Sequence, residues 1–266
     1  MTAISASQVK ELRDQTGAGM MDVKNALVET GGDLEAAKRL LREKGMAQAG
    51  KRAGRATAEG IVLVTVSGST GAIAAVGCET EPVSKNDEFI RFAEEVLETV
   101  EGEGPEGLAS LEQERVEAVA KLGENISLRG ARLEAGEGEL VADYVHPPAN
   151  KIGVLVRLKG GTPVFARQLA MHISWTEPRW ISRADVPEDV VAAERDIYLN
   201  SDEVKSKPEA AREKIVAGML NKRFFAEKGG VLLEQPWIHD NAKSVEQALS
   251  EAGAEVIAFE RLALGA

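Results

Sequence analysis

The stretch GCETEPVSKN, residues 77 to 86, holds the side chains of this sequence best suited to chemistry: the sole cysteine, Cys78, and the carboxylates of Glu79 and Glu81. A cysteine acts as a nucleophile when a neighbouring base lowers the pKa of its thiol. No histidine lies near Cys78 in the sequence, and Cys78 ends an apolar, strand-like run. The pattern favours a small core residue. The alternative hypothesis is that the protein is an enzyme with Cys78 as its nucleophile.

Metal and nucleotide sites require patterns that this chain lacks. Glu79 and Glu81 alternate along an extended segment, and a calcium loop supplies more oxygen ligands than two carboxylates. His146, His172 and His239 are too scattered for zinc-ligand spacing. His172 lies in LAMHISW, an apolar helical pattern that favours a buried or interface histidine over a ligand. GAGMM lacks the lysine and hydroxyl residue of a phosphate-binding loop, so we predict no catalytic residue, metal or cofactor.

Length and composition predict a soluble globular protein with more than one module. The chain has 266 residues, 44% of them hydrophobic. No run approaches the roughly 20 apolar residues of a membrane span. The start MTAISASQVKELRDQ lacks the basic segment and apolar centre of a signal peptide, so we expect a cytoplasmic protein.

The charge is unevenly distributed along the chain. A formal net charge of -11 argues against broad nucleic-acid binding, which needs clustered lysines and arginines. Residues 1–58 carry ten Lys or Arg against seven Asp or Glu, whereas residues 79–117 carry three against thirteen. The two regions would therefore present opposite electric fields to a partner.

The first 50 residues predict a module of three short helices. Apolar residues recur there at helical spacing: Val9 and Leu12; Met20, Val23 and Leu27; Leu34, Ala37 and Leu41. TGAG at 16–19 separates the first two helices, and GGD at 31–33 ends the second and offers Asp33 as the next N-cap. The Ala-, Gly- and base-rich stretch 44–60 suits a linker or a solvated helix, and we place the linker at 51–59.

The remaining residues predict an α+β core of antiparallel sheets with helices. Strand-like runs occupy 60–66, 72–78, 126–134, 139–146, 152–158 and 255–262. Helical patterns occupy 87–101, 110–124, 163–175, 187–203, 208–227 and 243–252. The order broadly recurs, so we predict two α+β halves, 60–146 and 147–266. The charged helices within 187–227 have few large apolar residues, which predicts a protruding helical hairpin.

Two methionines beside the TGAG turn are candidate contact residues. Met20 fits the apolar stripe of the module, but Met21 lies about 100° further around the helix and would point elsewhere. A solvent-facing methionine makes an adaptable contact surface. The alternative is that both methionines pack in the small core.

Long segments of the chain resemble one family, the bacterial elongation factors Ts, which exchange nucleotide on the GTPase elongation factor Tu. The resemblance begins with VKELRDQTGAGMMDVKNAL at 9–27 and continues through GDLEAAKRLLREKG, GKRAGRATAEG, CETEPVSKN, KLGENISLRG and LAMHISWTEPRW. It ends with KPEAAREKIVAGMLNKRFFAEKGGVLLEQPW at 207–237. The motifs cover nearly the whole chain in the family's order.

The resemblance implies a fold and a mechanism. It implies a ubiquitin-associated (UBA)-like N-terminal module, a core of two α+β halves and a helical hairpin. It also implies that the module and first half grip the nucleotide domain of elongation factor Tu while the second half grips a distal domain. The magnesium and phosphate contacts of GDP are then disturbed, and the magnesium belongs to the partner's site. Direct nucleic-acid or membrane binding is not implied.

The resemblance and the exposed-looking positions together nominate a set of partner-binding residues. These are Leu12, Met20, Met21, Thr80, Glu81, Pro82, Val83, Leu122, Gly123, His146, Leu169 and His172. The family usually reads Thr-Asp-Phe-Val where this chain has Thr80 to Val83, and the missing ring acts there as a wedge. A protein that binds the GTPase with weak or no exchange is therefore the alternative function.

Overall fold

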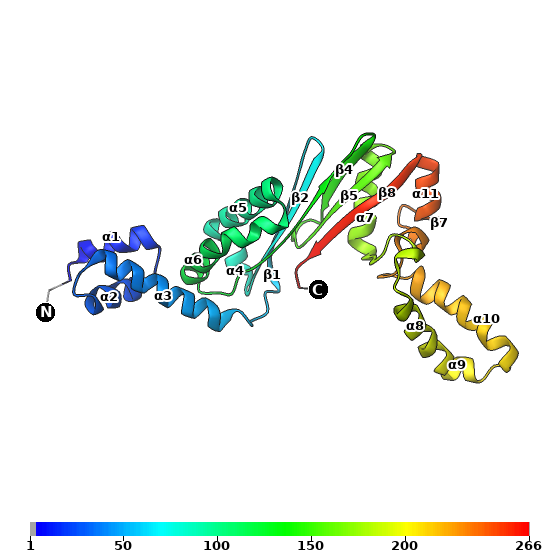
Figure 1. The fold of residues 1–266 in the computed structure, drawn as a ribbon, viewed down its shortest axis with the longest axis horizontal. Helices are drawn as coiled ribbons and strands as arrows, with labels where there is room; N and C mark the ends of the chain where they lie inside the picture. The colour runs from blue at the N-terminus through cyan, green and yellow to red at the C-terminus, as the bar shows by residue number, and fades with distance from the viewer. Residues whose placement is uncertain (1–3, 266) are drawn as a thin grey trace.

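The computed structural model describes residues 4–265, and its elements follow one another along a long, narrow outline (Figure 1). The N-terminal helices lie at one end and a helical pair lies at the other. Two sheets with their covering helices lie between them, and the C-terminus returns to the middle of the molecule. Mixed helix and antiparallel sheet confirm the α+β class.

The N-terminal module consists of α1 (Ala6–Thr16), α2 (Met20–Glu29) and the first part of α3 (Leu34–Arg52). The Ser5 hydroxyl accepts a hydrogen bond from the Gln8 backbone N–H at the start of α1, and Gly17, with a φ of 64°, ends that helix. The Asp33 side chain caps α3 in the same way, as predicted. The three helices share one small core, made of Leu12, Val23, Ala26, Leu27, Ala37 and Leu41. The likeness to a UBA fold stays a prediction.

The first sheet has the antiparallel order β1-β2-β3, with β1 (Glu59–Ser67), β2 (Thr70–Cys78) and β3 (Ser127–Glu134). Four helical elements connect β2 to β3. They are α4 (Glu81–Ser84), α5 (Asp87–Glu103), the 3₁₀ helix η1 (Pro105–Leu111) and α6 (Glu112–Leu122). The β1–β2 hairpin predicted around SGSTG is confirmed.

The second sheet has the antiparallel order β4-β5-β8, with β4 (Glu139–Val145), β5 (Ile152–Gly160) and β8 (Ala254–Ala263). Between β5 and β8 the chain forms α7 (Pro163–Thr176), η2 (Arg183–Asp185), α8 (Glu188–Asn200), α9 (Asp202–Lys205), α10 (Glu209–Met219) and η3 (Leu220–Phe225). It continues through η4 (Leu232–Glu234), β6 (Pro236–Trp237), β7 (Asp240–Ser244) and α11 (Val245–Ala252).

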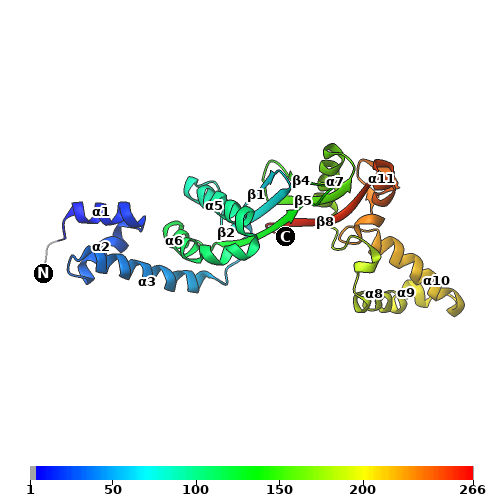
Figure 2. The ribbon, with the colours of Figure 1, turned by 45° about the horizontal axis from the view of Figure 1, so that its top comes forward.

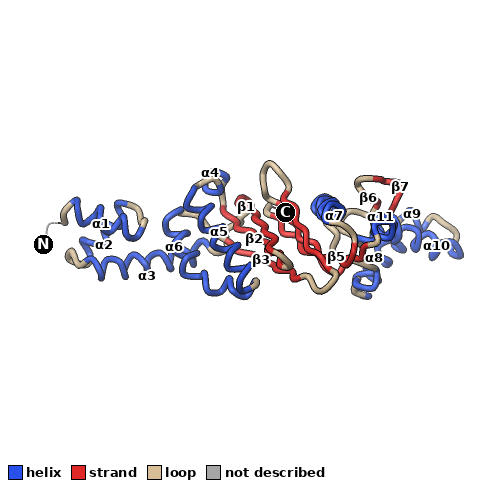
Figure 3. The backbone as a smooth tube through the Cα atoms, turned by 90° about the horizontal axis from the view of Figure 1, so that it is seen from above, coloured by secondary structure: helices blue, strands red, loops and turns tan. Residues whose placement is uncertain are grey.

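The two sheets pack face to face, and helices cover their outer faces (Figures 2 and 3). Side chains alternate along β2: Ala74 and Val76 face α5 and α6, whereas Ile73 and Ala75 face the second sheet. On β5, Gly153 leaves room for this approach, because a Cβ there would lie 2.6 Å from a methyl carbon of Val62. The core is therefore a four-layer helix–sheet–sheet–helix stack.

The sheet pairing differs from the predicted division of the core at residue 146. That division placed the strand at 139–146 in the first half, but β4 pairs along its length with β5 in the second sheet. The reason is local, because β4 and β5 are joined by a short connection and form an antiparallel hairpin. The chain thus crosses from one sheet to the other between Glu134 and Glu139.

The helix α3 extends beyond the module and rests on the core. Its Ala49 is buried in the cluster beneath α5 and α6, and Gly45 faces Ala120 of α6, where an added Cβ would lie 3.3 Å from the alanine Cβ. The basic stretch after residue 44 is therefore helical as far as Arg52. Only the segment between α3 and β1 connects the two parts without regular structure.

The helical pair α8–α10 protrudes at the far end of the molecule, as predicted (Figure 1). Arg195 of α8 lies 2.7 Å from Glu213 of α10, and Arg223 of η3 lies 2.8 Å from Glu203 of α9, so ion pairs join the outgoing and returning segments. The base of the pair shares an apolar cluster with η3 and the adjoining segments, which contains Val186, Val204, Val216, Met219, Leu220, Phe224, Phe225 and Val231.

Candidate functional site

The turn at residues 80–83 follows β2 after one intervening residue, Glu79, and carries the nominated group Thr80 to Val83. Thr80 is extended, and Glu81 and Pro82 begin the short helix α4. Proline lacks a backbone N–H, and the N–H groups of the first helical turn have no partner within the helix, so Pro82 suits this position. Glu81 and Pro82 are exposed, whereas Val83 is half-buried and packs against the apolar cluster around α5. The turn therefore presents Glu81 and Pro82 outward from an anchored base.

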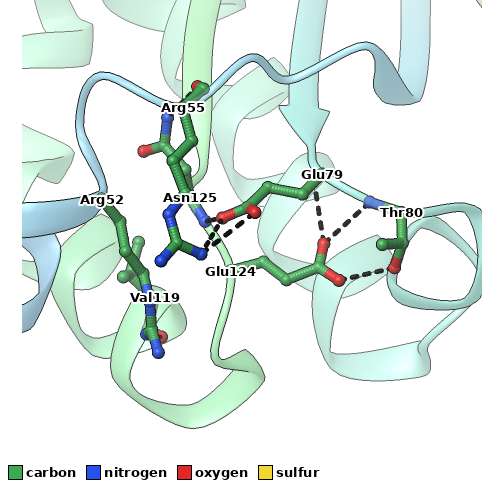
Figure 4. Close-up of polar contacts among 7 residues, drawn as sticks. All are labelled: Arg52, Arg55, Glu79, Thr80, Val119, Glu124 and Asn125. Atoms are coloured by element: carbon green, nitrogen blue, oxygen red, sulfur yellow. Dashed lines mark hydrogen bonds and ion pairs between the residues drawn. The ribbon is translucent and has the colours of Figure 1, made fainter.

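A carboxylate from another segment holds the backbone of this turn (Figure 4). One Glu124 oxygen accepts hydrogen bonds from the backbone N–H groups of Glu79 and Thr80, both at 2.9 Å. The other oxygen accepts from the Thr80 hydroxyl at 2.5 Å. Glu124 follows α6, so the turn and the C-terminal end of α6 are tied together. Sequence reasoning missed Glu124, because only the fold brings it to Thr80.

A second set of hydrogen bonds continues from Glu79 to the segment after α3 (Figure 4). The Glu79 carboxylate accepts from the Asn125 backbone N–H at 2.7 Å and pairs with Arg55 at 3.3 Å. The buried Asn125 side chain donates to the Arg55 carbonyl oxygen at 2.8 Å. The Asn125 hydrogen bond and then the Arg55 guanidinium hold the pKa of Glu79 below its ordinary value. Glu79 is therefore charged at neutral pH.

The electrostatics around Cys78 oppose nucleophilic chemistry. Burial, with a smaller contribution from the Glu124 charge, raises the pKa of the Cys78 thiol to about 12. The thiol donates to the Thr80 carbonyl oxygen at 3.3 Å and lies in the apolar cluster beneath α5. A reactive cysteine needs the opposite shift.

The exposed Glu81 pairs with Lys85 at 2.7 Å, and this hydrogen bond lowers the pKa of Glu81.

Two nominated residues lie beside this turn. Leu122 ends α6 and is half-buried against the first core half, and Gly123 follows it with a φ of 77°. That left-handed conformation favours glycine and stops the helix one residue before Glu124. The structure thus brings Leu122 and Gly123 to the end of the core that carries the 80–83 turn.

In the N-terminal module the nominated residues divide into two groups. Met20 and Met21 are exposed, with 59% and 63% of their surface accessible, so the alternative that both pack in the core is wrong. Leu12 is fully buried in the module core, which corrects its nomination as a contact residue. Val28, 60% exposed, was missed, although its spacing of seven residues from Met21 places both on one helix face.

The nominated residues of the second half are mostly internal. Leu169 and His172 of α7 are fully buried, which corrects their nomination as contact residues. The His172 ring stacks on Trp237 at 5.2 Å, and its Nε2 lies 3.1 Å from Oε1 of Gln235. Burial lowers the pKa of His172 to about 4. His146 is exposed at the end of β4, with its Nδ1 3.1 Å from the Tyr144 hydroxyl.

Neither a metal-binding cluster nor a membrane-spanning helix occurs among the described residues. Between residues 4 and 265, no three His, Cys, Asp or Glu side chains gather as a metal site would require. No helix in that range combines the length and the apolar character needed to cross a membrane. The nominated residues that remain accessible form separate surfaces on the module, on the 80–83 turn and at His146.

Comparison with known proteins assigns the chain to a family. The family described as Elongation factor TS matches residues 79–266. An elongation factor Ts of Psychromonas ingrahamii is 44% identical over 98% of this chain and 91% of that protein. Those of Stutzerimonas stutzeri and Photorhabdus laumondii are 42% and 41% identical over 100% of this chain and 92% and 93% of those proteins. This chain belongs to the elongation factor Ts family of translation factors.

Proposed function

We propose that this chain binds elongation factor Tu in its GDP form, in the cytoplasm, and promotes release of GDP so that GTP can replace it. The observation that carries the proposal is the family match, which spans nearly the whole chain at identities of 41% to 44%. Two accessible surfaces support the proposal. They are the methionine pair of α2 and the turn at 80–83, which is hydrogen-bonded to Glu124.

The proposed mechanism is a coupling of two binding equilibria. A factor that prefers the nucleotide-free GTPase weakens nucleotide affinity by the same ratio as nucleotide weakens its own. No covalent step on this chain is required, which agrees with the buried, protonated thiol of Cys78. The chain acts as a binding protein, and the magnesium that bridges the phosphates belongs to the partner.

The turn supplies a local means of disturbing the nucleotide site. Glu81 carries a negative charge, and Pro82 a small apolar surface, at an exposed position. A carboxylate brought near the partner's magnesium changes the electrostatics of phosphate binding. The methionines of α2 add apolar contact area, and full burial of a methionine stabilises a complex by roughly 1.5 to 3 kcal/mol.

The test is release of fluorescent GDP from the cognate elongation factor Tu in excess unlabelled nucleotide. The proposal expects a release rate that rises with factor concentration and then saturates. Binding without acceleration, measured by calorimetry on the same proteins, would instead establish the non-exchanging alternative. If the chain neither binds the GTPase nor accelerates GDP release, the proposal is wrong.

A further inference from the structure

The backbone at the end of β2 needs hydrogen-bond partners that the first sheet does not supply. The pairing of β1 with β2 ends at Cys78, opposite Glu59. The N–H groups of Glu79 and Thr80 therefore lie beyond the ladder, and both donate to the Glu124 carboxylate. Glu124 thus substitutes for a strand partner at the point where the chain turns toward Glu81.

Glu124 also fixes the direction of the Thr80 side chain. A threonine at the N-cap of a helix commonly uses its hydroxyl to accept from the helix backbone. The Thr80 hydroxyl instead donates to Glu124 at 2.5 Å, and no side chain caps α4. The three bonds converge on one carboxylate, so the turn has little freedom to rotate about the end of β2.

The neighbouring residue connects the same loop to the segment after α3. Asn125 donates from its backbone to Glu79 and from its side chain to the Arg55 carbonyl oxygen. Two residues further along that segment, the Thr57 hydroxyl lies 2.6 Å from the Ser127 hydroxyl. The loop after α6 therefore holds both the turn and the connection to the N-terminal module.

Location distinguishes a positioning role from a role in stability alone. Two of the three hydrogen bonds to Glu124 come from Thr80, which is exposed, and the third comes from the half-buried Glu79, so water can replace most of what is lost if the Glu124 carboxylate is removed. The cost to the free energy of unfolding is then small. The orientation of Glu81 and Pro82 would be lost, however, and water cannot restore it.

We propose that Glu124 is a positioning residue for nucleotide release: its carboxylate holds the 80–83 turn in the orientation in which Glu81 and Pro82 meet the GTPase. The inference rests on the proposed function. Glu124 is not proposed to contact the nucleotide or magnesium. Glu124 acts through the backbone of Glu79 and Thr80.

Three substitutions of Glu124 test its geometry. Glu124→Ala removes all three hydrogen bonds. Glu124→Gln keeps a carbonyl oxygen for the two N–H groups and offers an amide donor to the Thr80 hydroxyl oxygen. Glu124→Asp keeps the charge but shortens the reach by one methylene. Glu98→Ala, at an exposed site on α5, is the matched control for loss of one charge in the same half.

The measurement is GDP release from the cognate GTPase, titrated to saturation with each variant. We expect Glu124→Ala to lower the maximal release rate about tenfold or more, since small misplacements of acting groups have large rate effects. The half-saturating concentration and the midpoint of thermal unfolding should change little. Glu124→Gln and Glu98→Ala should match the parent, and Glu124→Asp should lie between Gln and Ala.

Hydrogen exchange on the free chain provides a readout that does not depend on the partner. In Glu124→Ala the amides of Glu79 and Thr80 should exchange faster than in the parent, while the amides of α7 should be unchanged. The inference fails if Glu124→Ala releases GDP at the parent's maximal rate. If that variant does not fold, Glu124→Asp at the parent's rate overturns it equally. A parent that does not accelerate release refutes the proposed function instead.

Discussion

The helix α2 of the N-terminal module leaves Met20 and Met21 more than half exposed, whereas α7 of the second half buries Leu169 and His172 completely. Among the described residues, the module core has six buried side chains with partly buried ones packed around them, so α2 contacts its neighbours along one narrow stripe. The helix α7 lies between the second sheet and the segment around Trp237, and its buried side chains contact both.

This difference separates two ways in which an apolar residue can matter for partner binding. An exposed methionine can lose its water directly against a partner, and its removal leaves the monomer intact. A buried leucine or histidine acts only by holding its surroundings in place. Substitutions in the two regions should therefore differ in what they change: affinity in the module, and folding in the second half.

The largest expected effect is on folding. Leu169→Ala should lower the free energy of unfolding by roughly 2 to 5 kcal/mol, because it leaves a cavity in the apolar cluster between α7 and the second sheet. Urea denaturation measures this. Val164→Ala, on the same helix and 71% exposed, is the control and should change stability by less than about 0.5 kcal/mol. A stable Leu169→Ala chain that lost partner affinity would restore Leu169 as a contact.

The buried histidine should make stability depend on pH. The unfolded chain binds a proton at His172 below about pH 6.5, but the folded chain does so only below about pH 4. Falling pH between these values therefore favours unfolding, by about 3 kcal/mol in total. Replacing the residue, in His172→Gln, should remove this part of the pH dependence.

The measurement is urea denaturation at several values between pH 4 and pH 7. Leu169→Ala serves as the control, because it removes no titrating group and should keep the parent's slope while being less stable throughout. A parent and His172→Gln variant with parallel profiles would show that His172 gains its proton as readily when folded as when unfolded.

The exposed methionines should show the reverse behaviour. Met21→Ala should weaken binding to the GTPase about tenfold, which corresponds to about 1.4 kcal/mol of lost apolar contact. Its unfolding free energy should stay within about 0.5 kcal/mol of the parent's. Titration calorimetry with Met46→Ala, an exposed methionine on α3, as the control measures the difference. Equal affinity in parent and variant would exclude Met21 from the interface.

The smallest expected effect concerns the exposed turn itself. Pro82→Phe combined with Glu81→Asp restores the ring and the shorter acid that the family usually carries, and should raise the maximal rate of GDP release by roughly two- to tenfold. Proline presents less apolar surface than phenylalanine for the proposed wedge. Pro105→Phe, at the exposed start of η1, controls for an added ring elsewhere. The wedge hypothesis is wrong for this pair of proteins if the parent is already as fast.

The local elements and the family could be predicted from short stretches of sequence. Helical spacing predicted α5 and α7 to within a few residues, and alternation around SGSTG predicted the β1–β2 hairpin, because these patterns arise from contacts between near neighbours. The quoted motifs pointed to the elongation factor Ts family, and the relatives confirm it. Element type and family could be predicted because both depend on patterns among residues that are close together in the sequence.

Which of those residues are accessible, and which are hydrogen-bonded to one another, depends on the tertiary structure. An apolar helical stripe is the same whether it packs against a partner or inside the core, so only the fold, which places Trp237 and Gln235 against His172, shows that His172 is internal. The placement of β4 in the second sheet likewise depends on β5 and β8. Glu124 is separated from Thr80 by 44 residues, and their hydrogen bonds exist because the loop after α6 folds back to the end of β2. Contacts over such separations leave no periodic trace in a single sequence.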